Sequence, residues 1–401
     1  MTGERLQRLL ERAGDVGRAD AEVRARLVVQ QAFGERAPEA RPAVSRGPLA
    51  VAVAVVAAAL IAVVAATSPG AAIAQWLRDH VIGKPGLRHS APALTHLPGG
   101  GRLLLRSQEG VWVVTADGTR RLLAGYAGAT WSPRGLYIGA WRGRELFAVE
   151  PGGRVHWSLA RPGRIRAADW SPDGYRIAYL TGDQLRVVAG DGTGDGVLRT
   201  RVALIAPAWR PQSPHLLAFA ARPRMVDLVA TDARALVWRH RVRERVAALS
   251  WSADGTLLAV AGRAGVTILN GRSGAVRRVI RMPHAERVRS IAFSQRGHKL
   301  AVVTRSARGR ARAFVVPVTA AHPRPRELFE GAGSFEQPQW SPDDRWVLLG
   351  WPTADQWLFL RAARVSSIRA VGAIARQFSS DPRRATFPRV GGWCCGPGGG
   401  G

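Results

Sequence analysis

The chain has 401 residues, 46% of them hydrophobic and 22% charged, which is typical of a folded globular protein and excludes an intrinsically disordered chain. The 58 basic residues outnumber the 29 acidic ones and give a formal net charge of +29. Such a surface attracts anions such as acidic polymers, phospholipid headgroups or nucleic acid. No stretch has the pattern of a helix-turn-helix or a zinc finger, so specific nucleic-acid recognition is not expected.

Residues 1–47 are predicted to form a cytoplasmic helical segment. Leu6, Leu9 and Leu10 recur at helical spacing, and Gly17 interrupts the pattern. Two interpretations remain open at this point. The segment either docks on a cytoplasmic partner or is a solvated stub beside the membrane.

A long apolar stretch comes next in the chain. The 18 residues from Leu49 to Ala66 read LAVAVAVVAAALIAVVAA and carry no charge. At 1.5 Å per residue they extend ~27 Å, close to the thickness of the hydrocarbon layer of a bilayer. We therefore predict one transmembrane helix over residues 48–67, followed by a linker over residues 68–92. Basic residues flank the helix equally on both sides, and we adopt the orientation that places the downstream domain outside the cytoplasm.

One phrase recurs through the rest of the chain. It reads WSPRG from Trp131, WSPDG from Trp170, WRPQS from Trp209, WSADG from Trp251, FSQRG from Phe293 and WSPDD from Trp340. The aromatic residues are 39, 39, 42, 42 and 47 residues apart, and a degenerate copy, LPGGG, begins at Leu97, 34 residues before the first. Repeats of this length predict a fold built from stacked identical units.

Each unit has the pattern of a four-stranded propeller blade. The aromatic residue ends a strand and wedges between neighbouring sheets, while Pro, Asp and Gly form a tight turn. Asp173, Asp254 and Asp343 recur at the same position of this turn, which indicates a structural rather than a catalytic role. We predict an all-β propeller over residues 93–393 with about seven four-stranded blades, or six if the copy at Leu97 forms none.

The phrase from Trp170 to Gly174 resembles the repeats of the TolB-like and WD-repeat-like β-propeller families. The resemblance extends over about residues 90–375. It implies the fold, whereas members of these families serve as binding platforms, enzyme covers or scaffolds, so it implies no single function.

The C-terminal segment is predicted to close the ring. Phe387–Trp393 has the pattern of a strand that pairs with a terminal blade, with a frayed end as the alternative, and residues 394–401 form a Gly-rich tail. Cys394 and Cys395 form either a disulfide, vicinal or intermolecular, or two free thiols. Two adjacent cysteines make neither a disulfide framework nor a metal site.

No catalytic, cofactor or metal site is predicted. The chain lacks a G-x-S-x-G nucleophile motif, a P-loop and a dinucleotide-binding fingerprint. Asp191–Gly196 begins like a calcium-binding loop, but Val202 stands where such a loop requires Glu, so a Gly-rich turn is preferred. The nine histidines are scattered singly, at His80, His89, His96, His156, His215, His240, His284, His298 and His322.

These features predict a noncatalytic, membrane-anchored propeller that binds a protein or an anionic envelope polymer through its blade-connecting loops. One alternative is a transmembrane regulator, in which residues 1–47 bind a cytoplasmic partner and the propeller senses the outside. A second alternative is an enzyme whose site lies in the propeller channel, where distant blades bring residues together. No small-molecule substrate and no cofactor are identified.

Overall fold

The computed structural model describes residues 90–213, 215–283, 286–363 and 367–395. The predicted cytoplasmic segment, the transmembrane helix and the first part of the linker lie outside these residues and stay predictions. Within the described ranges, no helix is long and apolar enough to cross a membrane.

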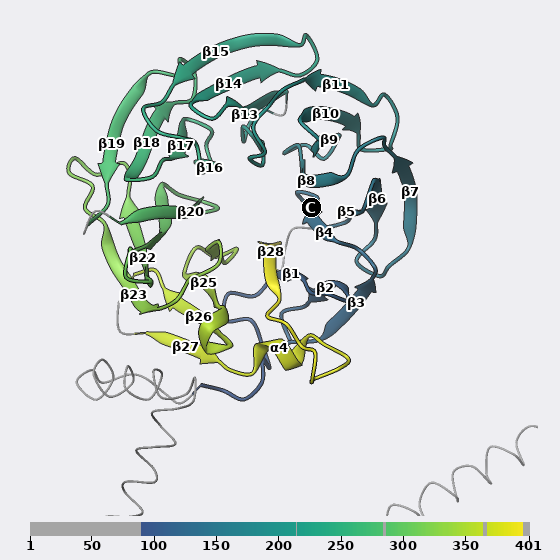
Figure 1. Cartoon of the computed structure of the whole chain (residues 1–401), viewed down its shortest axis with the longest axis vertical. Coiled ribbons are helices and arrows are strands. Elements are labelled where there is room, and N and C mark those ends of the chain that lie inside the picture. The colour runs from purple at the N-terminus through teal and green to yellow at the C-terminus, as the bar shows by residue number, and fades with distance from the viewer. Residues whose placement is uncertain (1–89, 214, 284–285, 364–366, 396–401) are drawn as a thin grey trace, which may run out of the picture. The chain divides into compact units, whose positions relative to one another are not determined.

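Seven antiparallel sheets of four strands each surround a central axis (Figure 1). This arrangement confirms the predicted all-β propeller and decides for seven blades rather than six. We number the blades in order around the ring and name the innermost strand of each blade first.

The strands of the first four blades have the following bounds. Blade 1 contains β28 (Arg389–Cys394), β1 (Arg102–Arg106), β2 (Gly110–Val114) and β3 (Arg120–Ala124). Blade 2 contains β4 (Gly128–Trp131), β5 (Ile138–Arg142), β6 (Glu145–Val149) and β7 (Val155–Ala160). Blade 3 contains β8 (Ile165–Trp170), β9 (Arg176–Thr181), β10 (Gln184–Ala189) and β11 (Gly196–Arg199). Blade 4 contains β12 (Ala208–Trp209), β13 (Leu216–Arg222), β14 (Met225–Ala230) and β15 (Ala235–Arg241).

The remaining three blades complete the ring. Blade 5 contains β16 (Ala248–Trp251), β17 (Leu257–Ala261), β18 (Gly265–Asn270) and β19 (Val276–Arg281). Blade 6 contains β20 (Arg287–Phe293), β21 (Lys299–Arg305), β22 (Arg310–Pro317) and β23 (Arg326–Ala332). Blade 7 contains β24 (Gln339–Trp340), β25 (Trp346–Trp351), β26 (Gln356–Arg361) and β27 (Ile368–Val371), with the short helices η2 (Pro352–Ala354) and α4 (Ile374–Gln377).

The hydrophobic core lies between the blades. Every sheet packs between two others, so its second strand is buried on both faces, and all six residues of β25 are buried. The outermost strand β7 is more exposed, since all six of its residues are exposed or partly buried.

The repeated tryptophans join neighbouring blades, as predicted. The indole Nε1 of Trp209 donates a hydrogen bond to the backbone oxygen of Asp169 in the preceding blade at 3.0 Å, and Trp251 donates to Ala208 in the same way at 3.1 Å. At Trp209 and Trp251 the wedge therefore combines burial of a large aromatic ring with a satisfied polar atom.

Blade 1 is assembled from both ends of the chain. Strand β28 pairs with β1, and Leu103 lies opposite Trp393, so the predicted closure is confirmed. Trp393 supplies the seventh aromatic wedge, and its Nε1 donates to the backbone oxygen of Gly100 at 2.8 Å. The degenerate copy at Leu97 therefore does belong to a seventh blade, since it leads into β1, but the aromatic wedge of that blade comes from Trp393, and Leu97 packs in the cluster around it.

The predicted borders of the propeller shift slightly at both ends. Ala91, assigned to the linker, forms a parallel bridge with Val371 at the outer edge of blade 7. Cys394, assigned to the tail, is the last residue of β28, and it forms a vicinal disulfide with Cys395. Both additions lengthen the segments that hold the ring closed.

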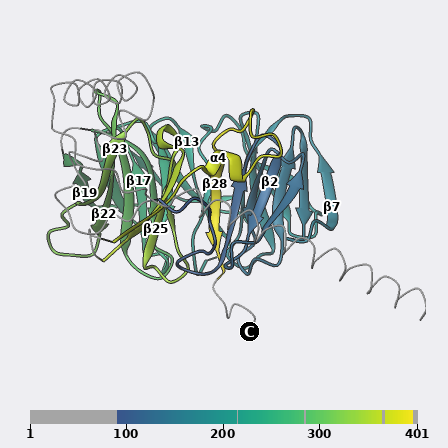
Figure 2. The ribbon, with the colours of Figure 1, turned by 90° about the horizontal axis from the view of Figure 1, so that it is seen from below.

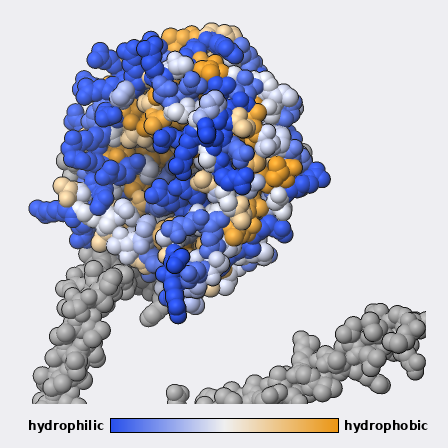
Figure 3. Space-filling model, turned by 45° about the vertical axis from the view of Figure 1, so that its right-hand side comes forward, coloured by the Kyte–Doolittle hydropathy of each residue, from blue (hydrophilic) through white to orange (hydrophobic). Residues whose placement is uncertain are grey.

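The propeller has two distinct faces, since successive strands are antiparallel. The repeat-turn face carries the turns that follow the aromatic wedges, such as Ser171–Tyr175. The blade-connection face carries the links from one blade to the next, such as Arg161–Arg164, and α4 lies on it (Figure 2). The side of the surface seen in Figure 3 is mainly hydrophilic, with apolar residues in separate patches.

Candidate functional site

The aspartates of the repeat turns stabilise those turns. Asp173 Oδ1 accepts hydrogen bonds from the hydroxyl of Ser171 at 2.5 Å and from the backbone N–H of Tyr175 at 3.0 Å. Asp254 and Asp343 accept the corresponding bonds from serine hydroxyls in their own turns at 2.6 and 2.5 Å. The turn geometry therefore agrees with the structural role predicted for these residues.

The segment that begins like a calcium loop is a turn with its carboxylates engaged. Asp191 Oδ1 accepts hydrogen bonds from the backbone and hydroxyl of Thr193 at 2.9 and 2.7 Å, and these bonds lower the pKa of Asp191. Asp195 Oδ2 pairs with the guanidinium of Arg186 at 2.5 Å. Across the residues that the structure describes, no group of three or more His, Cys, Asp or Glu side chains is placed to hold a metal ion.

The described histidines are distributed over several blades. Three of them contact a nearby carboxylate. The pairs are His156 with Glu150 at 2.9 Å, His215 with Asp232 at 2.5 Å and His298 with Asp254 at 2.9 Å. Each of these three histidines contacts a different carboxylate, so the contacts do not form a common site.

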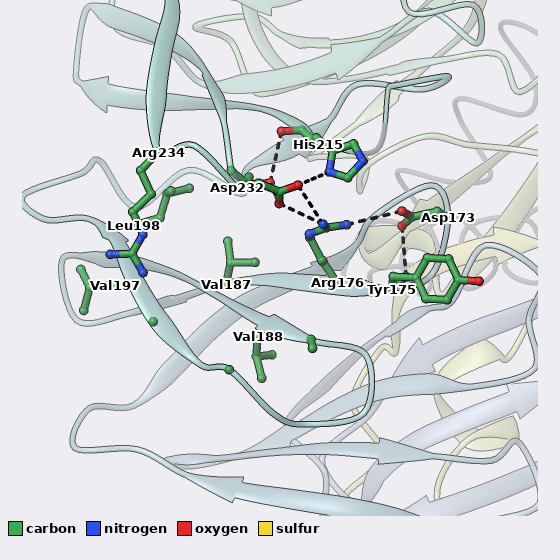
Figure 4. A pocket seen from close by; sticks show the side chains of 14 residues that line it. Asp173, Tyr175, Arg176, Val187, Val188, Val197, Leu198, His215, Asp232 and Arg234 are labelled. Atoms are coloured by element: carbon green, nitrogen blue, oxygen red, sulfur yellow. Dashed lines mark hydrogen bonds and ion pairs between the residues drawn. The ribbon is translucent and has the colours of Figure 1, made fainter.

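A pocket of about 560 Å³ lies between blades 3 and 4 on the repeat-turn face (Figure 4). Arg176 joins its two sides by contacting Asp173 at 3.5 Å and Asp232 at 2.9 Å, and His215 contacts the second oxygen of Asp232. The floor is apolar and consists of Val187, Val188, Val197 and Leu198. Because Arg176 already contacts two carboxylates, its charge is compensated within the protein.

The central channel contains a cavity of about 550 Å³ with walls of small side chains. Inner strands of five blades line it, mainly with Gly128, Ala129, Thr130, Ala167, Ala168, Ala208, Ser250 and Gly391. Small residues leave the channel open where the inner edges of the sheets face each other. Three arginines, Arg106, Arg166 and Arg389, also line it, together with larger side chains that include Trp141, Trp209 and Trp251.

These arginines lie at the channel mouth on the blade-connection face. A second cavity of about 630 Å³ shares Arg106, Arg166 and Arg389 with the channel and adds Arg164. All four side chains are exposed, and within the described residues only Arg389 forms an ion pair, with Glu336 at 3.6 Å. We call Arg106, Arg164, Arg166 and Arg389 the arginine mouth. In contrast to the pocket between blades 3 and 4, its positive charge is mostly uncompensated.

Two carboxyl groups near the arginine mouth have unusual protonation behaviour. Burial raises the pKa of Glu336 to about 7, although Arg389 and Arg106 act in the opposite direction. Deeper in the channel, burial raises the pKa of Asp169 to about 7 against hydrogen bonds from Trp170 and Thr130. Both carboxyl groups are therefore partly protonated at neutral pH, which leaves the arginine charge dominant.

Sequence reasoning missed the arginine mouth. Its members come from β1, the link before β8, β8 itself and β28, and none belongs to the repeated phrase. The only sequence signal is the general excess of arginine, which does not distinguish these four positions from the others.

Comparison with known proteins identifies the fold. No protein-family model matches the chain, and no curated protein matches its sequence. Solved structures that resemble it include hydrazine synthase from Kuenenia stuttgartiensis, at 15% identity and a TM-score of 0.50 over 60% of this chain and 78% of that chain.

Two further structures have a TM-score of 0.51. The β-propeller domain of Cps50 (Swd1) from Myceliophteria thermophila is 14% identical over 62% of this chain and 87% of that chain. Hsv2 from Kluyvelomyces marxianus is 10% identical over 67% of this chain and 93% of that chain. Likeness at these identities shows the fold alone, a seven-bladed propeller with WD-repeat-like structural neighbours.

Proposed function

We propose that the chain is a noncatalytic, membrane-anchored propeller that binds an acidic protein or an anionic envelope polymer at the arginine mouth. The observation that carries the proposal is the convergence of four exposed arginines from three segments of the chain on one cavity, with a single ion pair among them. Guanidinium groups bind carboxylates and phosphates through paired hydrogen bonds, which suits this class of ligand.

The surroundings of the arginine mouth support anion binding. The raised pKa of Glu336 and of Asp169 removes part of the nearby negative charge at neutral pH. Strands β1, β8 and β28 position the backbones of Arg106, Arg166 and Arg389 beside one another, so their charges act on the same ligand.

Binding of model polyanions to the full chain tests this proposal. Fluorescent polyglutamate represents an acidic protein and polyphosphate represents an envelope polymer, and their affinities are measured by thermophoresis. We expect the double variant Arg106→Ala, Arg166→Ala to weaken binding of the preferred polyanion by about tenfold or more, with a smaller dependence on salt.

The double variant Arg134→Ala, Arg296→Ala is the matched control. It removes two exposed arginines from the repeat-turn face and leaves the arginine mouth intact. If both double variants lose the same affinity, binding follows net charge rather than the arginine mouth, and the proposal fails.

The membrane anchor needs a separate test. Its support is the uncharged stretch over residues 48–67. Reporter proteins fused to each end of the chain should place the N-terminus in the cytoplasm and the propeller outside. A chain that remains in the soluble fraction after membranes are removed would contradict the anchor.

Asp169 favours a second candidate function, catalysis in the channel. A carboxyl group whose pKa is near 7 in a cavity is suited to general acid or base chemistry. A hydrolase screen of the full chain, with Asp169→Asn as its control, distinguishes the two functions. Turnover that disappears in this variant would favour catalysis over binding.

A further inference from the structure

The outermost strand of blade 5 exposes both apolar side chains and an unpaired edge. Among the described residues, strand β19 pairs with β18 alone, which leaves the backbone groups on its other side available to bind another strand. On this strand, Val276 is 48% exposed and Val279 is 61% exposed. An exposed edge with apolar side chains is a typical template for strand addition.

Cavities flank β19 on both sides. The cavity toward blade 4 has a volume of about 570 Å³ and contains Val276 and Val279 in its lining. The cavity toward blade 6 has a volume of about 420 Å³ and reaches Val279 again, together with Pro323. Side chains of an added strand would therefore find a recess on either side, as alternate residues of a strand point to opposite faces.

The charge around β19 is strongly positive. The two cavities are lined by six arginines, namely Arg241, Arg243, Arg277, Arg278, Arg281 and Arg324. The acidic side chain in the described lining is Glu244, and its Oε2 already accepts a hydrogen bond from the backbone N–H of Ala264 at 2.8 Å. The surface thus complements a partner that carries Asp or Glu.

The propeller itself contains an example of strand addition at an outer edge. Ala91 donates a backbone hydrogen bond to the oxygen of Ala370 at 2.9 Å and accepts one from the N–H of Gly372 at 3.0 Å. These bonds attach the segment before blade 1 to the edge of β27. The outer edge of β27 therefore accepts a residue from another segment, and β19 has the same outermost position in its blade.

We propose that β19 and its two cavities form a docking site for an extended peptide segment in which apolar residues alternate with Asp or Glu. The segment adds to blade 5 as a fifth strand, places its apolar side chains against Val276 and Val279, and pairs its carboxylates with the surrounding arginines. This site is distinct from the arginine mouth and does not depend on it.

A labelled peptide tests the docking site on the full chain. The peptide alternates Val and Glu over six residues, the length of β19, and its affinity is measured by fluorescence anisotropy. We expect Val279→Glu to weaken binding by about tenfold, because it removes an apolar contact and adds a repelling charge. Hydrogen exchange should show protection of β19 amides when the peptide binds.

Val155→Glu is the matched control, since Val155 is 47% exposed on β7, the outermost strand of blade 2. It should bind the peptide like the unmodified chain. Equal loss in Val155→Glu and Val279→Glu would overturn the proposal, as would equal binding of a Val-Lys peptide. Binding of anionic vesicles through Val279 without binding of the peptide would overturn it in favour of a lipid surface.

Discussion

Blades 1 and 3 reach the same arrangement by different routes. In blade 3 the aromatic wedge Trp170 and the turn around Asp173 are neighbours in sequence, so the unit forms from local contacts. In blade 1 the wedge Trp393 comes from the C-terminal segment, and its hydrogen-bond acceptor, Gly100, lies 293 residues away. The turn glycine of blade 1 also contacts the far end of the chain, because a Cβ at Gly101 would lie 2.5 Å from the backbone oxygen of Cys394.

This difference shows which part of the ring depends most on contacts between residues that are distant in the sequence. A contact that spans nearly the whole propeller costs more loop-closure entropy than one within a blade, so it contributes to stability only when the other blades are in place. The seam between β28 and β1 is therefore the place where substitutions should distinguish blade 1 from blade 3.

The largest loss of stability is expected when an aromatic wedge is replaced by alanine. Trp393→Ala should lower the free energy of unfolding by about 4 kcal/mol, because it leaves a cavity across the seam. It should cost about 1 kcal/mol more than Trp170→Ala, since the buried Nε1 of Trp170 has no hydrogen-bond partner within the described structure. Chemical denaturation followed by circular dichroism measures both. An equal or larger loss in Trp170→Ala would contradict the special role of the seam.

An intermediate effect on the free energy of unfolding is expected for the residue that directly precedes the aromatic wedge. This residue is Asp169 in blade 3 and Gly392 in blade 1. The pKa of Asp169 is raised to about 7 in the folded protein, whereas an unfolded aspartate titrates near 3.9. The folded state thus binds one more proton between about pH 4 and pH 7, and stability falls as pH rises through this window.

Asp169→Asn should remove the part of the pH dependence of stability that comes from this proton. It should also raise the free energy of unfolding at pH 7 by on the order of 2 kcal/mol. Thermal melting curves recorded between pH 4 and pH 8 give the slope of stability against pH. Asp183 is exposed and lies on the same blade, so Asp183→Asn should leave the slope of stability against pH unchanged. An unchanged slope in Asp169→Asn would show that the carboxyl group is already ionised in the channel.

The smallest loss of stability is expected when the disulfide at the end of the seam is reduced or removed. Cys394 and Cys395 are adjacent, so their bond closes the shortest loop possible and restricts the unfolded chain very little. Reduction, or the double variant Cys394→Ser, Cys395→Ser, should change the free energy of unfolding by less than about 1 kcal/mol. A loss comparable to that of Trp393→Ala would show that the disulfide, rather than strand pairing, holds the seam closed.

Much of the fold was predictable because each blade repeats a local pattern. The turns at Ser171 and Ser252 use the same hydroxyl and carboxylate, so one phrase identifies them both. The split blade was harder to recognise, since Trp393 precedes two cysteines instead of a Ser-Pro-Asp turn and the matching glycines stand near residue 100. A search for one continuous phrase does not join those two pieces.

The candidate site was not predictable in the same way. Arg166 lies 60 residues after Arg106, and Arg389 lies 223 residues after Arg166, and no spacing rule connects them. They meet because the ring brings the inner strands of blades 1 and 3 to one channel mouth. The exposed valines of β19 were likewise invisible, because an outermost strand has the same alternating pattern as any half-buried strand.

By itself, the sequence determined the repeat, the turn chemistry and the position of six aromatic wedges, because these depend on residues within a few positions of one another. It also determined the uncharged stretch over residues 48–67 and the excess of arginine. Only the tertiary structure decided the number of blades, the closure of blade 1 by Trp393 and the gathering of four arginines at one mouth. Those features depend on contacts between residues that are distant in the chain, and closing a ring is the physical step that brings such residues together.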